Sequence, residues 1–227
     1  MPQPAAPKRK RGRPPIEGLA ERRCDQILAV ATNLFAKHGY SNTDLQIVAD
    51  KLGVGKGTLY RYFPSKKQMF QAALDRVIKG MRLTVDTAVE AQQDPLDQIY
   101  AAIRAYLAYF DSHPEYVELI IQERAEFRDR KKPTYFQHSE VAIGRWHDFY
   151  RSLIAEGRIR EMPVERITDV IHNALYGTMC TNYFAGHDKT LTQQAEDILD
   201  VVLHGLLTPA ESARLKNSKP TRKELEK

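Results

Sequence analysis

The fold of this chain is decided by residues 54–63, which read VGKGTLYRYF. Two glycines open the stretch, and a helical period then places Leu59 and Phe63 on one face at i, i+4. The opposite face carries basic, hydroxyl and phenol groups from Lys56, Thr58, Arg61 and Tyr62. The apolar face is too small for a core helix, whereas the opposite face is rich in groups that bind phosphates and bases. We therefore predict a short helix that reads DNA.

The residues before this stretch complete a helix-turn-helix. Residues 43–52 predict a helix, because apolar residues recur at i, i+3, i+4 and i+7 from Leu45, and Thr43 and Gln46 have capping-box spacing. Gly53 makes the turn. An earlier helix runs from Arg22 to Gly39, with an apolar stripe of Ile27, Leu28, Ala31, Leu34 and Phe35. Two short helices joined by a tight turn can place the second one in the major groove.

The sequence after Pro64 also predicts helices, separated by short connections. Capping-box spacing at Ser65–Gln68 opens a long helix to about residue 91, and the same spacing at Ser112–Glu115 opens another. Further helices are expected over about 95–112, 134–156, 163 onward and 192–206. The fold class is therefore all-α: an N-terminal three-helix DNA-binding domain (21–67) and a larger C-terminal helical bundle (68–207), about nine helices in total. We expect residues 1–20 to form a disordered basic arm and residues 208–227 a polar tail.

Charge is distributed unevenly along the chain. Residues 1–16 hold five basic and no acidic side chains, and residues 22–67 hold eight basic and three acidic ones. Residues 68–207 hold 15 basic and 21 acidic side chains. The cationic first third and anionic remainder predict a nucleic-acid partner at the N-terminal end only.

Other function classes find little support in the sequence. The apolar runs are too short to cross a bilayer, no signal peptide opens the chain, and Cys24 and Cys180 have no zinc-site spacing. No catalytic motif is present, and Glu123 and Glu126 share a helix face as solvated acidic pairs do. We expect a cytoplasmic protein that is not an enzyme, with no metal, no cofactor and no membrane partner.

Residues 22–77 resemble the DNA-binding domain of the TetR family of transcriptional regulators. The residues that carry the resemblance are Ile27, Leu28, Ala31, Leu34, Phe35, Gly39, Tyr40, Thr43, Ala49, Gly53, Val54, Lys56–Tyr60, Phe63 and Lys66. The resemblance implies that Thr43, Lys56, Gly57, Thr58, Tyr60, Arg61, Tyr62 and Lys66 lie at the DNA, with Tyr60 and Lys66 on phosphates. Gln46, Lys56, Thr58 and Arg61 are the candidates for choosing bases.

Two positions depart from the family pattern. Gly55 replaces a common capping serine, so one hydroxyl contact is lost. Asp44 replaces the second threonine of a usual pair, and its charge favours a role at the helix dipole over a phosphate contact.

The basic arm carries a second DNA-binding signal. Its Arg11-Gly12-Arg13-Pro14 core with basic flanks resembles an AT-hook, in which two arginines enter the narrow minor groove of A·T-rich DNA. The alternative is a cationic tail that adds salt-sensitive, sequence-independent affinity.

The C-terminal bundle resembles the family only in length and helix count. That resemblance implies a ligand pocket, for which the candidates are Tyr106, Phe110, Trp146, Phe149, Tyr150, Asn173, Met179 and Tyr183. The alternative for each aromatic residue is a place in the core. The last two helices are expected to form the interface of a two-fold homodimer through Ala174, Thr178, Val201, Val202, Gly205 and Leu206.

The sequence thus predicts a dimeric repressor whose partners are a double-stranded DNA operator of pseudo-palindromic sequence and a small apolar or amphipathic effector. The alternative is an architectural protein of A·T-rich DNA, in which the basic arm dominates and no ligand exists. The recognition helix favours the first interpretation.

Overall fold

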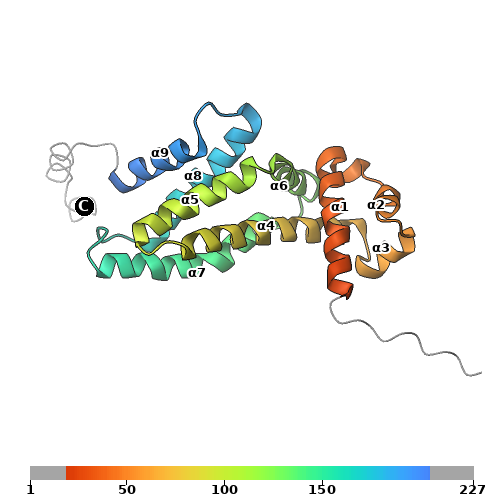
Figure 1. Cartoon of the computed structure of the whole chain (residues 1–227), viewed down its shortest axis with the longest axis horizontal. Helices are drawn as coiled ribbons and strands as arrows, with labels where there is room; N and C mark the ends of the chain where they lie inside the picture. The colour runs from red at the N-terminus through yellow and green to blue at the C-terminus, as the bar shows by residue number, and fades with distance from the viewer. Residues whose placement is uncertain (1–18, 205–227) are drawn as a thin grey trace, which may run out of the picture. The chain divides into compact units, whose positions relative to one another are not determined.

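The computed structural model describes residues 19–204, and this part of the chain contains nine helices and no strand (Figure 1). The helices are α1 (Leu19–Asn42), α2 (Leu45–Lys51), α3 (Lys56–Tyr62), α4 (Lys66–Glu90), α5 (Pro95–Asp111), α6 (Pro114–Glu126), α7 (Thr134–Ala155), α8 (Val164–Ala185) and α9 (Leu191–His204). The all-α prediction is confirmed. The chain divides into two compact units between Leu74 and Asp75, within α4. No helix of residues 19–204 is long and apolar enough to span a membrane.

The N-terminal unit is organised around an aromatic cluster. The Phe35 ring of α1 lies 5.1 Å from that of Phe70, edge to face, and the Tyr40 and Phe70 rings are 5.3 Å apart. Ile27, Leu59 and Met69 of the same unit are fully buried. α1 kinks at Gly39, whose φ of 78° is a conformation that favours glycine. The kink turns the chain from α1 toward α2.

The C-terminal unit is built around α5. This helix packs against α6, α8 and α9, and α7 packs against α8. Ile103, Tyr106 and Leu107 on α5 are all buried. Within this unit α4 is held to α5 by the Tyr109 hydroxyl, which donates to the Val77 carbonyl at 2.8 Å.

Helix starts agree with the sequence in one of three predicted capping boxes. Gln68 N donates to Ser65 Oγ at 3.2 Å, as predicted. The other two predictions are wrong. Asp44, and not Thr43, caps α2 by accepting from Gln46 N at 2.8 Å, and Ser112 ends α5 while His113 precedes α6 without a side-chain cap.

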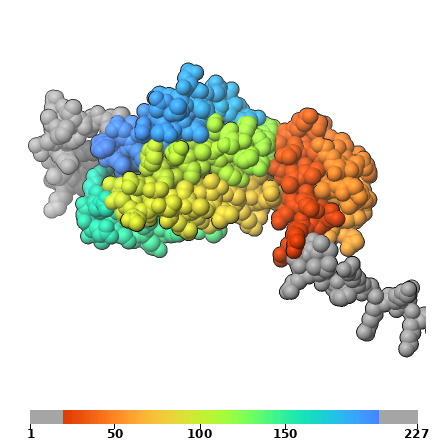
Figure 2. Space-filling model, viewed as in Figure 1, coloured from red at the N-terminus to blue at the C-terminus, as the bar shows by residue number. Residues whose placement is uncertain are grey.

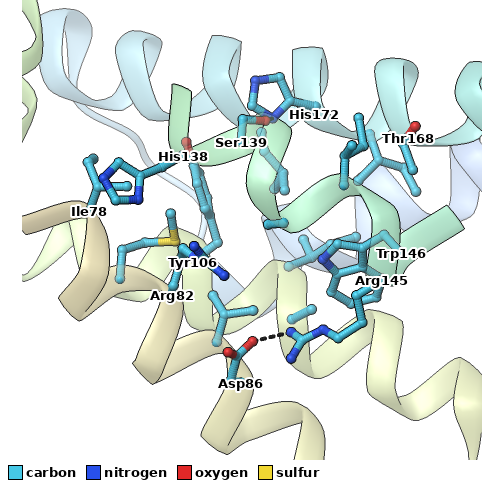
Figure 3. Close-up of a pocket in the computed structure, with 18 of the residues that line it drawn as sticks. Ile78, Arg82, Asp86, Tyr106, His138, Ser139, Arg145, Trp146, Thr168 and His172 are labelled. Atoms are coloured by element: carbon cyan, nitrogen blue, oxygen red, sulfur yellow. Dashed lines mark hydrogen bonds and ion pairs between the residues drawn. The ribbon is translucent and has the colours of Figure 1, made fainter. Parts of the chain in front are cut away.

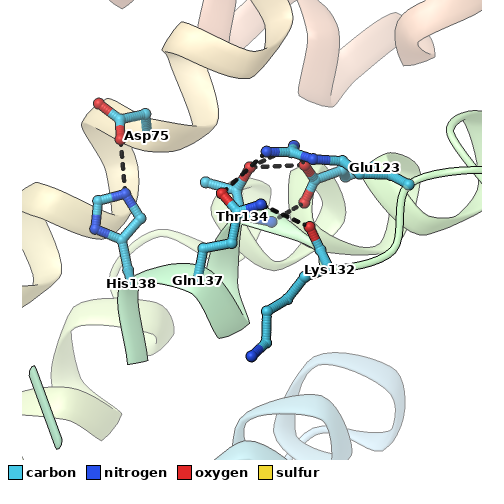
Figure 4. Close-up of polar contacts among 7 residues, drawn as sticks. Asp75, Glu123, Lys132, Thr134, Gln137 and His138 are labelled. Carbon is cyan, nitrogen blue, oxygen red and sulfur yellow. Dashed lines mark hydrogen bonds and ion pairs between the residues drawn. The ribbon is translucent and has the colours of Figure 1, made fainter. Parts of the chain in front are cut away.

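A buried carboxylate on α6 caps the N-terminus of α7. Glu123 is 1% exposed, so its expected solvated position is wrong. It accepts hydrogen bonds from Thr134 N at 2.8 Å and Thr134 Oγ1 at 2.7 Å, and it pairs with Arg130 (Figure 4). Because the first amide of a helix has no partner within that helix, Glu123 supplies the missing acceptor from α6.

Candidate nucleic-acid interface and ligand cavity

Helices α2 and α3 pack together as a helix-turn-helix, with Gly53 (φ 63°) at the turn. Leu59 is buried, as its place on the apolar face predicts, and Phe63 is 8% exposed. Tyr60, Arg61 and Gly57 are exposed, while Lys56, Thr58 and Tyr62 are half-buried. Arg61 forms no hydrogen bond or ion pair with any described residue, so its guanidinium remains available to a ligand.

An ion pair joins the starts of α2 and α3. Lys56 Nζ lies 3.0 Å from Asp44 Oδ1. The backbone amide of Gln46 and the lysine hold the pKa of Asp44 below its usual value, and the aspartate raises the pKa of Lys56. Gln46 itself donates to Asp50 Oδ1 at 2.8 Å. Two of the predicted base-reading side chains, Lys56 and Gln46, therefore already have carboxylate partners within this unit.

Thr43 and Lys66 have different surroundings from those predicted. Thr43 is 3% exposed, with its hydroxyl 2.6 Å from the Gly39 carbonyl oxygen, so it stabilises the turn after α1 and presents no exposed hydroxyl. Lys66 Nζ donates to the Ser41 carbonyl at 3.0 Å and lies 4.9 Å from the centre of the Tyr40 ring. A cation in the first turn of a helix is unfavourable for the helix dipole, and these contacts offset that cost for Lys66. Arg11 and Arg13 lie outside the described residues.

A cavity of about 150 Å³ lies within the C-terminal unit, between α4, α5, α7 and α8 (Figure 3). Its walls are mostly apolar, with Ile99, Ile103 and Leu175 among the lining residues. The Tyr106 and Tyr135 hydroxyls are 2.6 Å apart, and burial raises the pKa of both, so both phenols stay neutral. This combination of apolar walls with a few polar groups is typical of small-molecule sites.

An ion pair and a hydrogen bond connect α4 to α7 beside the cavity. Asp86 pairs with Arg145 across the site (Figure 3). Asp75 Oδ1 lies 2.6 Å from His138 Nε2 (Figure 4). Burial alone would raise the pKa of Asp75, but hydrogen bonds from Lys79 and His138 outweigh it, so the pKa is lowered and the carboxylate stays charged.

The predicted pocket residues separate into three groups. Tyr106, Trp146 and Tyr150 line the cavity. A smaller hollow of about 40 Å³ is lined by three others, Phe110, Met179 and Tyr183. Phe149 and Asn173 line neither: Phe149 packs against Trp146 and Tyr150, and Asn173 is exposed.

Sequence reasoning missed the contribution of α4 to the cavity. Ile78, Met81, Arg82 and Val85 line it at i, i+3, i+4 and i+7. The sequence did contain a signal for this contribution, because Arg82 is a charged residue within an otherwise apolar stripe of α4. A wider hollow of about 520 Å³ beside the α6–α7 connection was also missed, and its lining includes Arg124, Arg128 and Lys131.

Four of the six predicted dimer residues lie on α8 and α9, the helices drawn in shades of blue in Figure 2. Val201 is 49% exposed, and Ala174, Thr178 and Val202 are half-buried. Gly205 and Leu206 lie outside the described residues. The α8 face also exposes Val170, at 51%, and Phe184, at 70%. Exposed apolar side chains along one helix face are typical of protein interfaces.

Comparison with known proteins finds a family match for the N-terminal unit. A sequence profile described as "Bacterial regulatory proteins, tetR family" matches residues 27–73, which contain most of α1, all of α2 and α3, and the start of α4. Residues 27–73 therefore carry the DNA-binding domain of this family. The family resemblance recognised from the helix-turn-helix residues is thereby confirmed.

Relatives extend the similarity beyond the DNA-binding unit. The chain is 33% identical over 117 residues to YhgD of Bacillus subtilis, an uncharacterized HTH-type transcriptional regulator; the match spans 52% of this chain and 61% of YhgD. It is 22% identical to the transcriptional repressor KstR2 of Mycobacterium tuberculosis, over 84% of this chain and 96% of KstR2. The structure of FadR from Bacillus subtilis in complex with stearoyl-CoA has a TM-score of 0.67 at 16% identity, covering 81% of this chain and 99% of FadR. That likeness shows a shared fold.

Proposed function

We propose that this protein is a transcriptional repressor that binds a pseudo-palindromic operator as a dimer and is released by a small apolar or amphipathic effector. The observation that carries the proposal is α3, a short helix that buries Leu59 and exposes Tyr60 and Arg61 on a helix-turn-helix. The cavity in the C-terminal unit supplies an effector site. The names of the relatives support both parts, because KstR2 is a repressor and the FadR structure holds stearoyl-CoA.

The DNA contacts follow from exposure and chemistry. Arg61 and Lys56 suit guanine, and Gln46 suits adenine, once Lys56 and Gln46 exchange their present carboxylate partners for DNA. Thr58, Tyr60, Tyr62 and Lys66 are assigned to nearby base or phosphate contacts, and Gly57 lets the backbone approach closely. In the basic arm, Arg11 and Arg13 are assigned to the minor groove of A·T-rich flanks.

Effector control acts through α4. This helix runs without interruption from Lys66, beside the helix-turn-helix, to the cavity-lining residues Ile78 to Asp86. A ligand that fills the cavity better in one arrangement of α4 and α7 favours that arrangement. Release from DNA requires that the ligand bind the two arrangements with different affinity.

The dimer is assigned to α8 and α9. Val170, Phe184 and Val201 are exposed there, together with the predicted residues Ala174, Thr178 and Val202. A two-fold interface places two copies of α3 on two half-sites, which explains a pseudo-palindromic operator.

The test is selection of binding sites from fragmented genomic DNA with the full-length protein at physiological salt. We expect one or a few pseudo-palindromes, bound roughly 10³-fold more tightly than random DNA. Arg61→Ala should weaken operator binding by about fivefold or more, whereas Arg104→Ala, an exposed arginine on α5, should not. Recovery of many unrelated A·T-rich fragments would instead support the architectural alternative.

A further inference from the structure

The cavity has an unbalanced charge. Its lining includes Arg82, Asp86, His138 and Arg145. Asp86 pairs with Arg145, and His138 hydrogen-bonds Asp75. Arg82 forms no hydrogen bond or ion pair with any described residue. Once the paired groups are set aside, one fixed positive charge remains in the lining without a counter-ion.

The position of Arg82 makes that charge informative. It is half-buried on the same α4 stripe as Ile78, Met81 and Val85, which the helical period directs to the cavity. Figure 3 shows Arg82 on the α4 side of the site, opposite Arg145 and Trp146 of α7. A guanidinium on an apolar wall gives up part of its hydration without gaining a partner. A planar, two-oxygen anion provides the missing hydrogen bonds.

The remaining walls define the rest of the ligand. Tyr106, Trp146 and Leu175 offer aromatic and aliphatic surfaces. The volume of about 150 Å³ restricts the ligand to a small molecule. His172, which also lines the cavity, has its Nε2 buried without a hydrogen-bond partner. The space therefore suits a compact apolar body with one charged end.

We propose that the cavity binds a small amphipathic carboxylate, with its apolar body between α5, α7 and α8 and its carboxylate on Arg82. This inference rests on the proposed function, because it takes the cavity as the effector site. It narrows the effector from apolar or amphipathic molecules to monoanions. Arg82 is thus the residue that determines the charge of the ligand.

Trp146 provides a direct assay. It is the single tryptophan of the chain, and it lines the cavity. Its fluorescence is followed while the full-length protein is titrated with octanoate, octylammonium or 1-octanol, which share one chain length and differ in charge. We expect octanoate to bind about tenfold or more tightly than 1-octanol, with octylammonium weakest.

Two arginine variants separate this site from other anion sites. Arg82→Gln should remove the preference for octanoate while leaving the affinity for 1-octanol unchanged, which also shows that the cavity remains folded. Arg128→Gln is the matched control, since Arg128 lines the wider basic hollow beside the α6–α7 connection and not this cavity. It should leave all three titrations unchanged.

Three results would overturn the proposal: equal affinity for octanoate and 1-octanol, a preference that survives Arg82→Gln, or no Trp146 response to octanoate. Failure of the proposed function is distinguishable from these. If octanoate binds through Arg82 but does not change operator affinity, the anion site stands and effector control of DNA binding fails.

Discussion

Replacing Glu123 with glutamine tests how strongly the α6–α7 connection depends on one buried carboxylate. In the protein, three donors share its two oxygens: Oε1 accepts from Arg130 Nη1 and Thr134 Oγ1, and Oε2 accepts from Thr134 N. A glutamine amide offers one oxygen, so its NH₂ group must face at least one of these donors. Glu123→Gln keeps the shape of the side chain and changes only its charge and hydrogen bonding.

The expected cost follows from burial. A buried donor left without an acceptor costs about 1–3 kcal/mol, and replacing charged by neutral hydrogen bonds to the remaining donors loses about another 1 kcal/mol. Because the Arg130 side chain is 25% exposed, solvent screens part of its loss. We expect the free energy of unfolding of the C-terminal unit to fall by about 2–4 kcal/mol.

Urea unfolding followed by Trp146 fluorescence measures this value, because the only tryptophan lies in the C-terminal unit. Glu140→Gln is the matched control: Glu140 also pairs with a cation, Lys132, but its side chain is 62% exposed. Its cost should stay below about 0.5 kcal/mol. Equal and small costs for the two variants, measured at one protein concentration, would refute the argument from burial.

Three further predictions concern DNA, assembly and pH. Asp44→Asn keeps an acceptor for the α2 cap but removes the charge that now pairs with Lys56 of α3. Operator binding should therefore tighten, and its salt dependence should become steeper. Unchanged binding in a salt titration would contradict this prediction. Phe184→Asp should give monomers in size-exclusion chromatography with light scattering, while Val141→Asp, equally exposed but on α7, should remain dimeric. The hydrogen bond to Asp111 raises the pKa of His187 above 6.5, so its stabilising contribution is complete below that pH and is lost as pH rises through the folded pKa. In urea unfolding, the loss caused by His187→Gln should therefore be larger at about pH 6 than at about pH 8.5, and an equal loss would exclude this linkage.

The helices could be predicted from the sequence because their signals are local. Apolar spacing, together with Gly39, Gly53 and Pro64, places the first helices within a few residues of their observed bounds. The cap of α2 could not be settled in this way. Thr43 and Asp44 are both good capping residues, and the choice depends on whether the Thr43 hydroxyl reaches the Gly39 carbonyl across the kink.

The site was less predictable because facing helices, and not one stripe, define a cavity. Trp146 and Tyr150 line it, whereas Phe149, one residue away from Tyr150 on the same helix, packs outside it. Aromatic content alone therefore could not separate lining from core. Arg82, the charged position on the α4 stripe, was a sharper signal, since an arginine that is half-buried on an apolar face without a partner loses hydration and calls for a functional reason.

These charges also indicate how occupancy of the cavity could act on α4. Asp86–Arg145 and Asp75–His138 tie α4 to α7 at two levels of the same helix, three turns apart, with Arg82 between them in sequence. A carboxylate on Arg82 would add a negative charge about one helical turn from Asp86. This charge would compete with Asp86 for Arg145 and weaken the Asp86–Arg145 ion pair, while leaving the Asp75–His138 hydrogen bond in place. Such a ligand would therefore favour the arrangement in which α4 and α7 are less tightly held beside Asp86. A neutral ligand of the same size has no such preference, and this difference gives the charge of the effector a direct influence on the helix that begins at Lys66.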